Sequence, residues 1–218
     1  MKLSSVILFD LDGTLIDSTE AILESFFVAY EKFGDRPPAR EAIAALIGEP
    51  LPRMFSKLGD LRAPVEEYVT AYKAHYCRIS RQKTRLLPGA REAIDRAASF
   101  ARLGVVTTKT GRYSVELLEH FGVMDRFDVL VGSEDVSRHK PHPEPVRKAL
   151  AKMGYEEGPV WMIGDTPMDV EAALAAGVEP FAVSCGYAPV EALEKGTSNI
   201  ASDALNAVLE IEKRQSLL

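Results

Sequence analysis

Two aspartates separated by one residue follow a short apolar segment near the start of the chain. Residues 6–9 (VILF) predict a buried strand of a parallel sheet, and Asp10, Asp12 and Gly13 come directly after it. If the strand continued that far, both carboxylates would point the same way. Because buried carboxylates repel one another, such a pair indicates a metal ion or a role in chemistry. Taken alone, the pair is equally compatible with ordinary loop acids.

A hydroxyl group and an amino group form a second set of candidates. The segment 104–107 predicts a strand that ends in Thr107, whose hydroxyl could donate to an anion, although threonine is also simply a good strand former. Lys140 precedes Pro-His-Pro, and two prolines restrict the backbone around its ammonium group. This arrangement suits a charge that is needed at one place, whereas most surface lysines are merely solvated. His139 and His142 have no partner at a ligand spacing, and we interpret both as bystanders.

Two further acids lie near residue 165. Asp165 directly follows a predicted strand at 160–163, and Asp169 lies at the start of a predicted helix at 168–176. Thr166 as N-cap and Asp169 three residues later predict a capping box, which explains Asp169 without any function but leaves Asp165 unexplained. Ligands of open α/β sheets bind at the carboxyl ends of the strands. We therefore expect these two acids to join Asp10 and Asp12 in an oxygen-rich cluster suited to Mg²⁺.

The elements that must position these groups alternate between strands and helices. This alternation predicts an α/β fold with a doubly wound parallel sheet. A crossover between parallel strands needs about a dozen residues, yet about ninety separate the first strand from the second. Most of this insertion has helical patterning, with helices expected at about 18–33, 39–47, 51–58 and 64–80. We predict a core of residues 1–15 and 85–218 and an all-helical cap of residues 16–84, placed to act as a lid.

Composition excludes several classes of protein. The chain has 218 residues, 46% of them hydrophobic, and a formal net charge of −6, which argues against nucleic acid as the main partner. We expect no signal peptide and no membrane span, because the start runs directly into the first strand and every apolar run is short. Cys77 and Cys185 are expected to be free thiols in a cytoplasmic protein that is a monomer or a homodimer. The chain also lacks the motif of a P-loop nucleotide site.

Four motifs together resemble the haloacid dehalogenase superfamily of phosphatases. In chain order they are Asp10-Leu11-Asp12-Gly13-Thr14, Thr107, Lys140 and Gly164-Asp165-x-x-x-Asp169. Each motif is modest by itself, but all four occur in the family's order and span essentially the whole chain. The resemblance implies a Rossmannoid core, a helical cap inserted after the first strand, Mg²⁺ as cofactor and a small phosphorylated metabolite as substrate.

The resemblance also implies a role for each matching residue. Asp10 would attack phosphorus and form an aspartyl-phosphate, whereas Asp12 would protonate the leaving oxygen and then activate water. Thr107 and Lys140 would hold phosphoryl oxygens. The implied metal ligands are Asp10, the backbone carbonyl of Asp12, and Asp165, with Asp169 in a supporting position.

Within the superfamily, residues 87–89, 104–109, 140–143 and 185–187 look like the phosphoglycolate phosphatase group, so phosphoglycolate is the substrate expected first. A related pyrophosphatase also carries Thr-Thr-Lys at 107–109, whereas phosphoglycolate phosphatases more often have asparagine in place of Thr108. The expected substrate-binding residues are Thr108, Gly48 and Arg53, the last as a contact for a distal anion. Pyrophosphate hydrolysis, phosphoryl transfer of the β-phosphoglucomutase type and a non-catalytic binding role stay open as alternatives.

Overall fold

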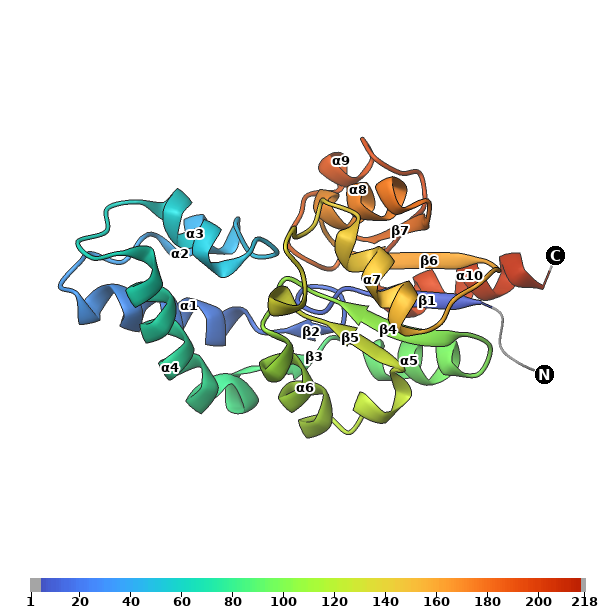
Figure 1. Ribbon diagram of the computed structural model, residues 1–218, viewed down its shortest axis with the longest axis horizontal. Coiled ribbons are helices and arrows are strands. Elements are labelled where there is room, and N and C mark those ends of the chain that lie inside the picture. Colours follow the sequence, from blue (N-terminus) through green and yellow to red (C-terminus); the bar gives the residue numbers. More distant parts are fainter. Residues whose placement is uncertain (1–4, 217–218) are drawn as a thin grey trace.

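The computed structural model describes residues 5–216, in which a six-stranded parallel sheet carries helices on both faces (Figure 1). Residues 1–4, on which the expected absence of a signal peptide rests, lie outside that range. The sheet has the order β5-β4-β1-β6-β7-β8, so strand order reverses beside the central strand β1. The strands are β1 (Val6–Phe9), β4 (Arg102–Val106), β5 (Val129–Val131), β6 (Val160–Gly164), β7 (Glu179–Val183) and β8 (Ile200–Ala201). The predicted doubly wound α/β fold is confirmed.

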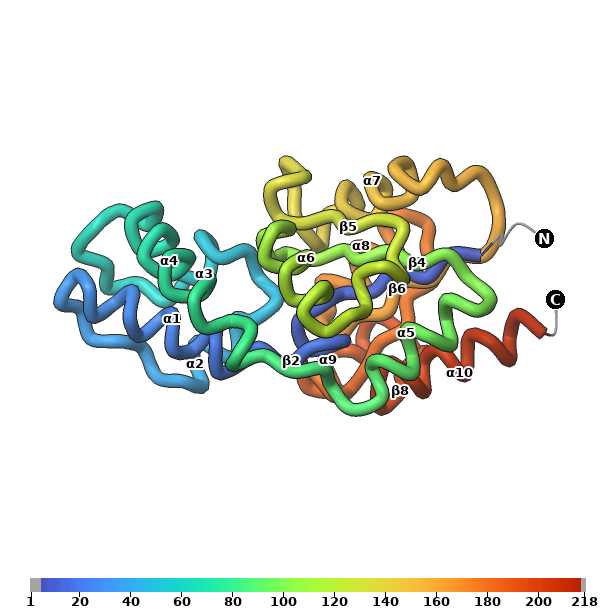
Figure 2. Tube along the Cα trace, turned by 90° about the horizontal axis from the view of Figure 1, so that it is seen from below, coloured from blue at the N-terminus to red at the C-terminus, as the bar shows by residue number. Residues whose placement is uncertain are grey.

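Alternate residues of β1 pack on opposite faces of the sheet. Ile7 and Phe9 belong to the core on the side of α5 (Ala90–Ala98), α6 (Gly111–His120) and α10 (Ala204–Gln215). Val6 and Leu8 pack on the other side, against α7 (Glu144–Lys152) and α8 (Pro167–Ala176). Figure 2 shows α7 and α10 on opposite sides of the strands. Burial on both faces accounts for the continuous apolar sequence of this strand.

Four helices lie together at one end of the molecule (Figure 1). They are α1 (Thr19–Lys32), α2 (Arg40–Ala44), α3 (Leu51–Leu58) and α4 (Val65–Lys83). Their shared core is aromatic, with Phe26, Phe55 and Tyr68 fully buried. A short antiparallel pair, β2 (Ile16–Asp17) and β3 (Arg85–Leu86), connects these helices to the sheet. We propose that this helical group is the cap predicted for residues 16–84.

The shortest elements differ from those expected. The sequence did not predict the two-residue strands β2, β3 and β8, or the 3₁₀ turns η1 (Met124–Arg126) and η2 (Ser133–Asp135), because none of these short segments has a measurable periodicity. Helix α2 is also shorter than the expected 39–47, and α9 (Val190–Leu193) has a single turn. None of the helices in residues 5–216 has the length and apolar composition required to cross a membrane.

Candidate active site

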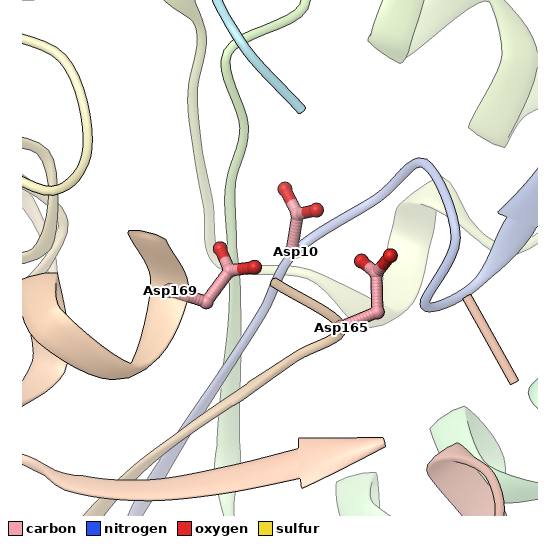
Figure 3. Close-up of side chains that lie close together, drawn as sticks. All are labelled: Asp10, Asp165 and Asp169. Atoms are coloured by element: carbon pink, nitrogen blue, oxygen red, sulfur yellow. The ribbon is translucent and has the colours of Figure 1, made fainter. Parts of the chain in front are cut away.

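Three acids converge at the carboxyl edge of the sheet, where strand order reverses. Asp10 follows β1, Asp165 follows β6, and Asp169 lies in the first turn of α8 (Figure 3). One carboxylate oxygen from each acid lies within 4.8 Å of the others, and all three residues are buried. The backbone N–H of Asp10 donates to the carbonyl of Ile163 at 2.8 Å, which ties the end of β1 to β6.

The ammonium group of Lys140 lies among these acids. Its Nζ is 2.7 Å from Asp10 Oδ1 and 2.5 Å from Asp169 Oδ1, and it also donates to the carbonyl of Val106 at 3.0 Å. The side chain is only 3% exposed. Burial lowers the pKa of Lys140, but the two carboxylates raise it more, so the pKa lies above its ordinary value and the group stays charged.

One lysine does not neutralise the acidic cluster. Burial raises the pKa of Asp10 from 3.8 to about 7, against the opposing attraction of Lys140. Burial, followed by the charges of Asp10 and Asp169, also raises the pKa of Asp165 well above its ordinary value. Hard carboxylate oxygens with an excess of negative charge are the donors that Mg²⁺ prefers. The cluster therefore fits a divalent cation, which Asp10, Asp165 and Asp169 could hold.

The neighbours of Asp165 fix its carboxylate. Thr14 Oγ1 donates to Oδ1 at 3.1 Å, and the backbone N–H of Tyr187 donates to Oδ2 at 2.8 Å. Gly13 has a φ of +84°, and a Cβ on Gly13 or on Gly186 would overlap the Asp165 side chain. Glycine at both positions lets the backbone approach the carboxylate closely.

Asp169 has two functions at once. Its Oδ2 accepts from the backbone N–H of Thr166 at 3.0 Å and from the Thr166 hydroxyl at 2.7 Å, which is the capping box expected from the sequence. Its Oδ1 accepts from Lys140. Asp169 therefore caps α8 and also fixes the ammonium group beside Asp10.

The Asp12 carboxylate has different partners from that of Asp10, and the extended strand on which the two were expected to point the same way ends before both residues. Strand β1 ends at Phe9, and Asp12 lies in the turn that follows. Its carboxylate accepts from the Ser18 hydroxyl and from Lys109 Nζ, at 3.0 Å and 2.9 Å from the lysine. The Asp12 carboxylate is therefore not part of the acidic cluster, and only its backbone carbonyl is left for a metal role.

Sequence reasoning missed Ser18 and Lys109. Ser18 occupies the N-cap position of α1, but its hydroxyl makes no capping hydrogen bond and donates to Asp12 instead. Lys109 belongs to the Thr-Thr-Lys segment after β4, and this was the available signal. Its direction toward Asp12 depends on the turn after β1, which has no signature in the sequence.

The two threonines after β4 face different partners. Thr107 is buried, and its Oγ1 accepts from the backbone N–H of Lys109 at 3.1 Å, which leaves the hydroxyl proton for an anion. Thr108 Oγ1 donates to the carbonyl of Gly48 at 2.7 Å. Thr108 thus connects the sheet edge to the loop between α2 and α3.

Arg53 is expected to bind a distal anion, and in the structure it pairs with Glu49. Its side chain is 60% exposed, and its Nε is 3.2 Å from Glu49 Oε2. Lys57 also pairs with Glu49, at 2.5 Å from Oε1. In this arrangement Glu49 pairs with both cations.

A cavity of about 990 Å³ lies between the helical group and the sheet edge. The residues named above that line it are Asp12, Gly48, Glu49, Arg53, Thr108, Lys109 and Lys140. His139 and His142 also line it, and each has a ring nitrogen bonded to the backbone, at Ser133 and Glu144 respectively. The cavity therefore opens onto groups from both parts of the molecule.

The similarity of the chain to known proteins agrees with this geometry. Residues 7–183 match the family model for haloacid dehalogenase-like hydrolases. The pyrophosphatase PpaX of Halalkalibacterium halodurans is 34% identical over 84% of both chains, and that of Bacillus mycoides is 32% identical over 98% of this chain and 99% of its own. A predicted phosphoglycolate phosphatase from Haemophilus somnus has the same fold, with a TM-score of 0.87 and 23% identity, and the match covers 97% of this chain and 99% of its own. The chain belongs to the family of haloacid dehalogenase-like hydrolases.

Proposed function

We propose that the protein is a Mg²⁺-dependent phosphatase that hydrolyses a small phosphoryl compound through an aspartyl-phosphate on Asp10. One observation carries the proposal: Asp10 is buried between acids that fit a divalent cation and a lysine that binds only one of its oxygens. Within residues 5–216, its Oδ2 has no hydrogen-bond donor, so this oxygen is available for attack on phosphorus. An exposed carboxylate hydrated by water would be a weaker nucleophile.

In the first step, Asp10 Oδ2 forms a bond to phosphorus while the bond between phosphorus and the leaving oxygen breaks. Asp12 supplies the proton that the leaving oxygen takes up. In the second step, Asp12 takes a proton from water, whose oxygen attacks phosphorus and releases phosphate and the Asp10 carboxylate. The Thr107 hydroxyl holds a phosphoryl oxygen throughout. Lys140, whose three N–H groups contact Asp10, Asp169 and Val106, would exchange one of these contacts to hold a second phosphoryl oxygen. Mg²⁺ would supply further neutralisation of the negative charge that develops on these oxygens.

The substrate that we propose first is inorganic pyrophosphate. The relatives from Halalkalibacterium halodurans and Bacillus mycoides are named pyrophosphatases, and the Thr-Thr-Lys segment at 107–109 supports the same choice. Phosphoglycolate, the first expectation from the sequence, is the second candidate, supported by the similar motifs at 87–89, 140–143 and 185–187. The cytoplasmic location and the monomeric or homodimeric state stay predictions.

Phosphate release from a panel of substrates tests this function. The panel holds pyrophosphate, phosphoglycolate, hexose phosphates, nucleoside monophosphates and p-nitrophenyl phosphate, each with Mg²⁺ and with a chelator. We expect Mg²⁺-dependent release, with kcat/KM for pyrophosphate about a hundredfold above the others. A preference for phosphoglycolate would show that pyrophosphate is the wrong substrate, but it would agree with the proposed reaction. No release from any member of the panel would contradict the proposed function.

Arg53 is proposed to bind the distal anion after leaving Glu49. Arg53→Ala should then raise KM about tenfold with little change in kcat, because one charged contact to the substrate is lost. Glu49→Gln is the matched variant: it removes the competing carboxylate and should lower KM. An unchanged kcat/KM in Arg53→Ala would show that Arg53 does not bind the substrate.

A further inference from the structure

Lys109 is the cation that contacts Asp12, and the four motifs assign it no role. Its Nζ lies 3.0 Å from Asp12 Oδ1 and 2.9 Å from Oδ2, and both side chains are 10% exposed. The hydroxyl of Ser18, at the N-terminal end of α1, donates to the same carboxylate. The carboxylate is therefore held from two directions, which fixes both its place and its rotation.

The two oxygens of Asp12 are not equivalent. Oδ1 accepts from Ser18 and from Lys109, whereas within residues 5–216 Oδ2 accepts from Lys109 alone. A carboxylate oxygen offers about two acceptor positions. Oδ1 is thus fully used, while Oδ2 keeps one position free, and Asp12 lines the cavity in which a substrate would lie.

Lys109 in turn depends on the helical group. Its Nζ lies 4.7 Å from the ring centre of Tyr76, a buried residue of α4, and Tyr76 stacks on Tyr72 with ring centres 5.6 Å apart. A desolvated ammonium group over an aromatic ring is attracted to the negative face of the ring. The sheet edge supplies Lys109 and the helical group supplies the ring, so the place of the ammonium group depends on α4 lying against the sheet.

We propose that Lys109 is a positioning residue for Asp12. It turns Asp12 Oδ2 toward the cavity as the atom that exchanges the proton with the leaving oxygen, and Tyr76 makes this arrangement depend on the contact between α4 and Lys109. The inference rests on the proposed function, because it requires Asp12 to protonate the leaving group. It adds a residue outside the four motifs and assigns the proton transfer to one oxygen.

Dependence on the leaving group tests the proposal, with Lys109→Met as the variant. An alkyl phosphate that the wild type hydrolyses, such as phosphoglycolate, needs the proton, whereas 2,4-dinitrophenyl phosphate releases a stable phenolate without it. The quantity to compare is kcat/KM, because it covers only the steps up to release of the leaving group. We expect a loss of about a hundredfold with the alkyl phosphate and of less than about threefold with the dinitrophenyl ester.

Matched variants separate positioning from charge and from folding. Lys73→Met removes the same charge from the same cavity, and within the described residues Lys73 makes no hydrogen bond to Asp12. It should change both esters by the same factor. Lys109→Arg should recover part of the alkyl phosphate activity. Tyr76→Leu should show a smaller loss selective for the alkyl ester, whereas Tyr76→Phe, which keeps the ring, should not.

The Asp12→Asn variant separates this inference from the proposed function. If Asp12→Asn loses activity selectively on the alkyl phosphate and Lys109→Met loses both esters equally, Lys109 does not position Asp12 and the inference is wrong. If Asp12→Asn itself shows no selectivity, Asp12 is not the proton donor and the proposed function fails in that step. Circular dichroism and urea unfolding identify any variant that is not folded, in which case Lys109→Gln replaces Lys109→Met with the same expected selectivity.

Discussion

Asp10→Asn should stabilise the protein at pH 8 in the presence of a chelator. Burial raises the pKa of Asp10 from 3.8 to about 7, and this rise corresponds to about 4 kcal/mol of folding free energy that is lost when the carboxylate is ionised. Asparagine has nearly the same shape and no charge, so it removes this cost. Because the amide also attracts Lys140 less strongly, we expect a gain of about 2–4 kcal/mol.

The sign of the pH dependence follows from the direction of the pKa. A carboxyl group with a raised pKa in the folded state binds more protons folded than unfolded between about pH 4 and pH 7. Stability therefore falls as the pH rises through this window and is lowest above it. For the wild type without metal, the ionisation of Asp10 alone should lower the free energy of unfolding by about 2–3 kcal/mol between pH 5 and pH 8. Asp165, whose pKa is also raised, acts in the same direction.

Urea unfolding at pH 5 and pH 8, with EDTA and with Mg²⁺, measures these differences. Mg²⁺ at a hundred times its dissociation constant should restore about 2.7 kcal/mol to the wild type and less to Asp10→Asn. Asp125→Asn, the same change at an exposed acid, is the matched control and should alter neither the stability nor its pH dependence. A wild type more stable at pH 8 than at pH 5 without metal, or an Asp10→Asn variant less stable than the wild type there, would refute the reasoning.

Three further substitutions test the surroundings of the site. Burial raises the pKa of Glu134, but its hydrogen bonds, led by the one from the backbone N–H of Gly111 at the start of α6, together outweigh burial and lower the pKa. The stabilisation from a lowered pKa is fully present above the unfolded-state value and is lost as the pH falls through the folded-state value. Glu134→Gln should therefore cost about 0.5–1 kcal/mol at pH 7 in urea unfolding, and the difference should vanish in acid, where the carboxyl group is protonated in both states. Thr166→Ala breaks the capping box and should cost about 1 kcal/mol by the same assay; no loss would mean that α8 does not need this cap. Gly13→Ala would force a Cβ against Asp165, so it should raise the Mg²⁺ concentration for half-maximal activity, and an unchanged metal titration would contradict that placement.

Much of the acidic cluster could be predicted because it depends on strand ends alone. A buried parallel strand has a clear apolar signature, and the carboxyl ends of neighbouring strands meet at one edge of the sheet. The positions of Asp10 and Asp165 therefore follow from two short apolar segments. Asp169 was predictable as a capping residue from Thr166, although its contact with Lys140 was not.

The surroundings of Asp12 could not be predicted, because they depend on a turn and on contacts between distant segments. The strand ends one residue before Asp10, and the turn sends the Asp12 carboxylate toward Ser18 and Lys109. Lys109 is 97 residues away in the chain, and no spacing rule connects the two. Likewise, Arg53 has the charge for an anion, but only the structure places Glu49 beside it.

The most direct test of the proposed chemistry is to trap phosphate on Asp10. The enzyme is quenched with acid during turnover of its best substrate, the acyl phosphate is reduced with borohydride, and the peptides are analysed by mass spectrometry. We predict that Asp10 is converted to homoserine, that no other acid is modified, and that the yield requires Mg²⁺. Modification of a different residue, or steady turnover with Asp10 unmodified in rapidly quenched samples, would contradict the account.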